Sequence, residues 1–168
     1  MPRTFVVLAH EGPDLLTRVA SLCRRRAFAL ESITIGRTQT PGVSRVTLSV
    51  NSDEAGARRL VANLERLVDV VQVEDVTNRP VVVRDLAMIK VSASPESRAD
   101  IMQLVQVFRA RVVDVAADSL VIETTGTDDK VDGLLQVLRP FGVLEVARTG
   151  HLAMCRGSSG AIEETPQV

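Results

Sequence analysis

Aromatic side chains are scarce in this sequence, which contains four phenylalanines and neither tyrosine nor tryptophan. Proteins that hold single-stranded nucleic acid commonly stack its bases on aromatic rings, so this composition argues against that class. The formal net charge of −1 also supplies no long-range attraction to nucleic acid or to an anionic membrane. We therefore expect neither a nucleic acid nor a membrane among the partners of the chain.

Cysteines and long apolar runs are sparse as well. Cys23 and Cys155 are too few and too far apart in sequence for a disulfide framework or a metal-ligand cluster. No apolar run approaches the ~18 residues of a membrane-spanning helix, and no basic-then-apolar leader begins the chain. We expect a soluble, cytoplasmic protein in which Cys23 is a core thiol, because it lies on the apolar face of a predicted helix.

What the sequence does contain is a clear strand–turn–helix–strand unit over Thr4–Ile35. Phe5–Ala9 is a short apolar strand, and Gly12-Pro13-Asp14 ends it with proline where a helix can begin. Glu31–Ile35 then alternates as a half-buried strand does. Between the two strands, apolar residues recur on one face of a helix, at Leu15, Leu16, Val19, Ala20 and Cys23.

The same order of elements occurs twice, which predicts an α+β fold of two tandem ferredoxin-like βαββαβ units. The first half is completed by strands at Val43–Val50 and Leu67–Val73, with a helix capped by Asn51 or Ser52 between them. The second half has predicted strands at Asp85–Ser92, Arg111–Ala116, Ser119–Thr125 and Val143–Arg148, and helices that begin at Ser94-Pro95-Glu96 and Thr127-Asp128. We expect a domain over residues 1–76, a linker over 77–82, a second domain over 83–157 and a flexible tail over 158–168.

Catalytic patterns are nearly absent. Neither His10 nor His151 is linked by a sequence pattern to a nucleophile or to metal ligands, and no phosphate-binding glycine loop is present. Glu11 and Asp14 are two carboxylates near the first turn without an acid–base partner. The chain is therefore not expected to be an enzyme on its own. Free N–H groups at the start of the first helix suit the carboxylate of a small ligand, although this stretch alone favours an ordinary turn without a ligand.

Several strings in the sequence resemble the small regulatory subunit of acetolactate synthase (acetohydroxyacid synthase), an ACT-domain family. They are LLTRVASLCRRRAFALESITIG and SRVTLSV in the first half, and LAMIKV, FRARVVDVAADSLVIETTG, GVLEVARTG and CRG in the second half. The resemblance covers about residues 3–157. It implies a non-catalytic subunit that binds and activates a large catalytic subunit carrying thiamine diphosphate, FAD and Mg²⁺, in branched-chain amino acid biosynthesis. It also implies a homodimer through the ACT domains, with valine bound between them as a feedback inhibitor.

The expected effector site of this chain departs from the family pattern. Asp14 stands where the family has glycine, Glu11 stands where a neutral or acidic polar residue is typical, and Ala29 replaces an asparagine that contacts the effector across the dimer. Ala27 likewise replaces a glycine. The resemblance places the small amino acid effector near Glu11, Asp14, Leu15, Leu16, Ala29 and Leu30, and these departures predict weakened valine feedback. A free-standing amino-acid-sensing ACT protein that regulates another partner is the alternative function.

Overall fold

The computed structural model describes residues 1–158 and 161–162, and its chain divides into two compact units. The first unit comprises Met1–Val82 together with His151–Val168, and the second comprises Val83–Gly150. The expected tail over 158–168 falls mostly outside the described residues. The sequence assigned residues 151–157 to the second domain, but the final described strand belongs to the first unit because that unit includes the chain from His151 onward.

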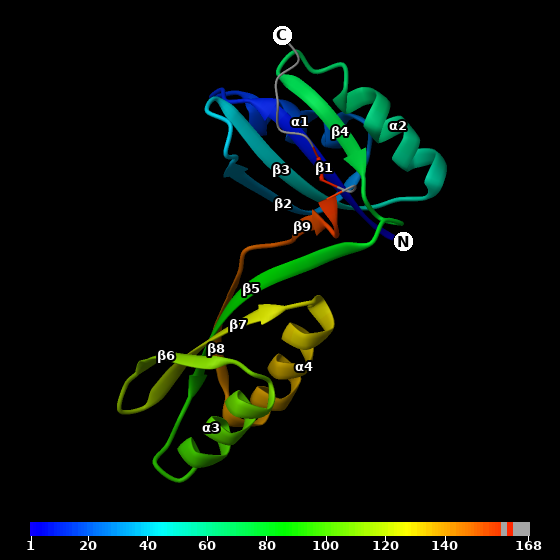
Figure 1. The fold of residues 1–168 in the computed structure, drawn as a ribbon. Helices are drawn as coiled ribbons and strands as arrows, with labels where there is room; N and C mark the ends of the chain where they lie inside the picture. The colour runs from blue at the N-terminus through cyan, green and yellow to red at the C-terminus, as the bar shows by residue number, and fades with distance from the viewer. Residues whose placement is uncertain (159–160, 163–168) are drawn as a thin grey trace. The chain divides into compact units, whose positions relative to one another are not determined.

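The first unit is a four-stranded antiparallel sheet with two helices (Figure 1). Its elements are β1 (Pro2–His10), α1 (Leu15–Arg25), β2 (Ala29–Arg37), β3 (Val43–Asn51), α2 (Glu54–Leu64) and β4 (Val70–Asp75). The strand order β2-β3-β1-β4 places the first strand beside the third and fourth, which is the order of a ferredoxin-like fold.

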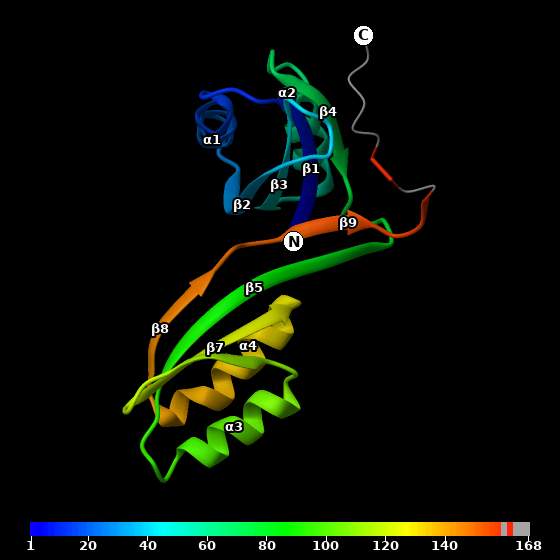
Figure 2. The same cartoon turned by 60° about the vertical axis from the view of Figure 1, so that its left-hand side comes forward.

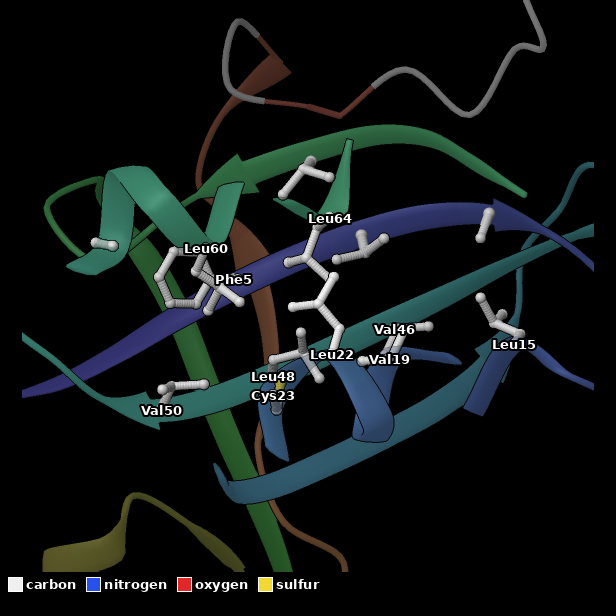
Figure 3. Close-up of a cluster of buried hydrophobic side chains, with 14 residues drawn as sticks. Phe5, Leu15, Val19, Leu22, Cys23, Val46, Leu48, Val50, Leu60 and Leu64 are labelled. Atoms are coloured by element: carbon white, nitrogen blue, oxygen red, sulfur yellow. The ribbon is translucent and has the colours of Figure 1, made fainter. Parts of the chain in front are cut away.

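Both helices of the first unit pack on one face of this sheet (Figure 3). Alternate residues of β1 and β3 face the helices because side chains alternate along a strand. The buried cluster contains Phe5, Val7, Ala9, Leu15, Val19, Leu22, Cys23, Val46, Leu48, Val50, Ala57, Leu60, Leu64 and Val73. Cys23 is 2% exposed, so the prediction of a core thiol is confirmed. Leu16 was predicted on the same face but is 48% exposed, and this part of the prediction is wrong.

The opposite face of the first sheet meets the C-terminal segment. This segment contains β9 (Leu152–Cys155) and lies against the sheet in Figure 2. The guanidinium of Arg45 on β3 donates to the carbonyl of Ala153 at 2.8 Å. Val6 and Leu8, which point away from the helices, are each only 1% exposed. The two central strands of the first sheet, β1 and β3, are therefore buried on both faces. β9 also pairs with β5, whose first two residues belong to this unit.

The second unit repeats the fold of the first. Its elements are β5 (Val81–Ser92), α3 (Arg98–Val107), β6 (Arg111–Val115), β7 (Ser119–Gly126), α4 (Asp128–Leu138), the 3₁₀ turn η1 (Arg139–Phe141) and β8 (Val143–Arg148). The order β6-β7-β5-β8 is again ferredoxin-like, and α3 and α4 pack on the core side of this sheet. Two tandem βαββαβ units are thus confirmed.

Several helix starts and strand bounds differ from the sequence-based expectation. Asp53, and not Asn51 or Ser52, caps α2, because its carboxylate accepts the amide of Gly56 at 2.7 Å. The strand predicted over Leu67–Val73 begins only at Val70, since residues 65–69 form turns after α2.

The third helix also begins later than expected. Ser94-Pro95-Glu96 forms a turn in which Ser94 and Ser97 exchange hydrogen bonds, and α3 follows from Arg98. The serine hydroxyls satisfy the amides that a first helical turn would otherwise leave without acceptors.

Candidate effector site at the start of the first helix

The site begins where β1 ends. The chain leaves the sheet at His10, whose amide donates to the carbonyl of Asp69 at 2.8 Å, and enters α1 at Leu15. The amides of Leu16 and Thr17 have no acceptor among the described residues. First-turn amides carry the positive end of the helix dipole, so these two groups suit an anion or a carbonyl oxygen.

A shallow, open pocket of about 390 Å³ lies beside this turn. The β1–α1 turn supplies one wall and the end of β2 with the start of β3 supplies the other. The lining residues are Glu11, Gly12, Pro13, Leu15, Leu16, Ile35, Gly36, Arg37 and Ser44. Glu11 and Arg37 form an exposed ion pair at 3.6 Å between Oε1 and Nε. One carboxylate, one guanidinium and two unpaired amides can together bind a small zwitterion.

Three of the predicted site residues therefore line one pocket, namely Glu11, Leu15 and Leu16. The exposed side chain of Leu16 offers an apolar surface there, next to Ile35, which is 41% exposed. The sequence prediction missed the second wall, formed by Ile35, Arg37 and their neighbours.

The signal for the second wall was present in the predicted topology. Because β1 and β3 run antiparallel, the end of β1 lies beside the start of β3, and His10 is paired with Val43. The amide of Glu11 also donates to the carbonyl of Gly42 at 2.8 Å. The connection from β2 to β3 must therefore reach the β1–α1 turn, and the end of β2 comes with it.

Asp14 lies outside the pocket lining. It precedes α1, its side chain makes no capping hydrogen bond, and its carboxylate is 3.9 Å from a guanidinium nitrogen of Arg18. Arg18 also pairs with Asp69 at 3.1 Å. The Asp14 side chain is 69% exposed, so water and Arg18 both screen its charge from the pocket.

Ala29 and Leu30 lie at the opposite end of β2 from the pocket. Ala29 is exposed, and Leu30 packs against the core of the first unit. The six-residue separation from Ala29 to Ile35 spans about 20 Å of extended strand. A single chain therefore does not bring Ala29 or Leu30 to the pocket that Glu11 and Leu16 line.

Ala27, the other departure noted in the sequence, has a left-handed backbone with φ of 55°. It lies just after α1, where the amides of Ala27 and Phe28 donate back to the carbonyls of Arg24 and Cys23. Glycine is the usual residue in this helix-ending conformation because it has no Cβ to clash. Ala27 therefore adopts this chain reversal at some cost in backbone strain.

Across residues 1–158 and 161–162, no group of three or more His, Cys, Asp or Glu side chains is arranged to hold a metal ion. Within the same ranges, no helix is long and apolar enough to cross a membrane.

Comparison with known proteins shows the family to which the chain belongs. Residues 84–157 match the family described as small subunit of acetolactate synthase, and residues 5–72 match the AHAS small subunit-like ACT domain. A probable acetolactate synthase small subunit of Archaeoglobus fulgidus is 42% identical over 94% of this chain and 99% of its own length. The chain belongs to the acetolactate synthase small-subunit family.

Further members of the small-subunit family agree with this placement. The acetolactate synthase small subunit of Bacillus subtilis is 41% identical over 94% of this chain and 92% of its own length. The crystal structure of the acetolactate synthase small subunit from Thermotoga maritima superimposes with a TM-score of 0.88 at 36% identity. It covers 94% of this chain and 99% of its own length, so the likeness includes both units.

Proposed function

We propose that this small subunit binds a large catalytic subunit of acetolactate synthase in the cytoplasm and raises its activity, without catalysing a reaction itself. The observation that carries the proposal is the match to small subunits along nearly the whole chain, through both units. In this proposal thiamine diphosphate, FAD and Mg²⁺ belong to the catalytic subunit, and the regulatory chain consists of the two predicted domains, with its segment from His151 returning to the first unit. Acetolactate formation from pyruvate, measured with and without this chain, tests the proposal.

We propose further that two copies pair through β2. This strand is at the edge of the first sheet, and an edge strand with free backbone groups is prone to pair with another chain. A two-fold axis through Ile33, the midpoint of β2, would place Ala29 of one copy opposite Arg37 of the other. The two separated parts of the predicted effector site would then meet, which supports the dimer. Sedimentation as a monomer at tens of micromolar would contradict it.

The same dimer supports a proposal of weakened valine feedback. A valine in the pocket would have its ammonium near Glu11 and its carboxylate near Arg37 or the free amides of α1. Ala29 of the second copy would offer it a methyl group where the family has an amide. A lost hydrogen bond of this kind is worth about 1 kcal/mol.

The charge of Asp14 weakens valine binding less than its position in the sequence suggests. Two charges at 4 Å repel by about 4 kcal/mol at an effective dielectric of 20, but by only about 1 kcal/mol in water. The exposure of Asp14 and its pairing with Arg18 favour the lower figure. Both changes together would weaken valine binding by about tenfold or more.

Calorimetric titration of valine into the native chain and into the Asp14→Gly, Ala29→Asn and double variants tests this proposal. The double variant should bind at least tenfold more tightly than the native chain, with Ala29→Asn contributing more than Asp14→Gly. Arg18→Gln, which removes the guanidinium that pairs with both Asp14 and Asp69, should weaken binding slightly. Native binding as tight as that of the double variant would refute weakened feedback, and it would leave the activation proposal unaffected.

A further inference from the structure

A second pocket of the first unit lies at the opposite end of α1. It has a volume of about 380 Å³ and is lined by Leu22, Arg25, Arg26, Asn63, Arg66 and Leu67. Arg25 is the last residue of α1, Arg26 follows it, and Arg66 lies in the turn after α2. The 11 residues of α1 separate this pocket from the effector pocket by about 16 Å along the helix. The two pockets are therefore distinct sites.

Within residues 1–158 and 161–162, the three arginines of this pocket have no carboxylate partner. Among the described residues, no ion pair and no side-chain hydrogen bond is formed by Arg25, Arg26 or Arg66, and no acidic residue lines the pocket. Several other arginines of the same unit are paired, as Arg58 is with Glu54 at 2.6 Å. Three positive charges thus surround one concavity without local compensation.

Helix-end electrostatics explain part of this arrangement. A cation near the C-terminus of a helix is stabilised by the helix dipole, and Arg25 meets that description for α1. This effect places a cation at a helix end, but it does not require three arginines to line one pocket. Their mutual repulsion instead favours an anion between them.

We propose that this pocket binds a phosphate-bearing small molecule. Guanidinium groups donate paired hydrogen bonds that match the oxygens of a phosphate. A phosphate or diphosphate also carries several negative charges, which can neutralise the positive charges of three arginines. A single carboxylate would neutralise only one of the three positive charges. The pocket volume lies in the range of small-molecule sites. Leu22, which belongs to the buried cluster of Figure 3 and is only 5% exposed, also lines the pocket and offers an apolar surface to the rest of the ligand.

Titration of inorganic pyrophosphate into the purified chain at low ionic strength tests the proposal. We expect sub-millimolar binding that Arg25→Gln and Arg66→Gln each weaken about tenfold or more. Arg24→Gln is the matched control, since it removes the same charge from the same arginine triplet but its side chain does not line the pocket. It should weaken binding less than threefold. No binding at millimolar pyrophosphate, or equal losses in Arg24→Gln and Arg25→Gln, would overturn the site.

A second measurement separates a small-molecule site from a protein-docking surface. The Arg25→Gln/Arg66→Gln double variant should retain the thermal unfolding of the native chain, because both side chains are exposed. It should also co-purify with the catalytic subunit as the native chain does. Loss of that co-purification in a folded variant would show that the arginines hold an acidic surface of a protein partner, and the phosphate proposal would be wrong.

Discussion

Replacing Asp85 by asparagine should destabilise the second unit more than any other single charge change there. The Asp85 side chain is 2% exposed and accepts hydrogen bonds from Nε of Arg148 at 2.6 Å, Oγ1 of Thr149 at 3.1 Å and the amide of Gly150 at 3.1 Å. It therefore fixes the end of β8 to β5 at the point where the chain leaves this unit. Asparagine would place an N–H group against a guanidinium or another donor, because one of its two terminal atoms can no longer accept.

The magnitude follows from the burial of the two partners. Removing one partner of a fully buried ion pair costs about 3–5 kcal/mol. Arg148 is 30% exposed and keeps Asp128 at 2.6 Å and Asp132 at 2.9 Å, so we expect about 2–3 kcal/mol. For a domain of this size that corresponds to a fall of about 10–20 °C in the melting temperature.

The pH dependence of this loss can be worked out from Arg148. Burial lowers the pKa of Arg148, but the hydrogen bond and charge of Asp85, with the charges of Asp128 and Asp132, outweigh burial and raise it. A raised folded-state pKa contributes stability that is fully present below the unfolded value and is lost only as pH rises through the folded value. Arginine stays protonated in both the folded and the unfolded chain over the whole neutral range. Titration of Arg148 should therefore not alter the difference in free energy of unfolding between the native and Asp85→Asn chains between about pH 6 and pH 9.

Denaturant unfolding, followed through hydrogen exchange of β5 and β8 amides, measures this effect. Asp132→Asn is the control, because that side chain is 63% exposed and its ion pair should contribute less than about 1 kcal/mol. An Asp85→Asn loss no larger than the Asp132→Asn loss would refute the reasoning.

Three further predictions concern the first unit. Ala27→Gly should raise the free energy of unfolding by about 0.5–1 kcal/mol in chemical denaturation, because relief of the left-handed strain exceeds the added chain entropy; a loss would contradict this. Burial raises the pKa of the Cys23 thiol, so a thiol reagent at pH 8 should modify Cys155 at least tenfold faster, and equal rates would show that Cys23 is accessible. Asp53→Ala should cost about 1 kcal/mol in thermal unfolding and Ser52→Ala less than half of that, because only the first loses the cap; the reverse order would place the cap at Ser52.

The order of elements could be predicted because it depends on local patterns. Apolar alternation, turn residues and helix periodicity predict both βαββαβ units. The observed bounds differ from the predicted ones by a few residues, as at the starts of β4 and α3. The covering of the first sheet by β9 was not predicted, because a four-residue strand has too little pattern to be recognised. One signal was available. The run Phe5–Ala9 is apolar at every position, which is typical of a strand buried on both faces.

The candidate site was half predictable for a similar reason. Glu11, Leu15 and Leu16 follow one another around a turn that the sequence marks with Gly-Pro, so their neighbourhood is local. Arg37 comes from the far end of β2, and the direction of the Asp14 side chain depends on Arg18 one helical turn away. Ala29 lies about 20 Å from the pocket along β2, so its predicted role depends entirely on a second copy of the chain.

Reconstitution with the catalytic subunit from the same source tests the central claim most directly. Acetolactate formation from pyruvate would be followed for the catalytic subunit alone, for this chain alone and for the mixture, with thiamine diphosphate, FAD and Mg²⁺ present throughout. We predict no turnover by this chain, and a severalfold higher rate for the mixture that saturates as the chain is added. A catalytic rate unchanged at saturating amounts of the folded chain would contradict it.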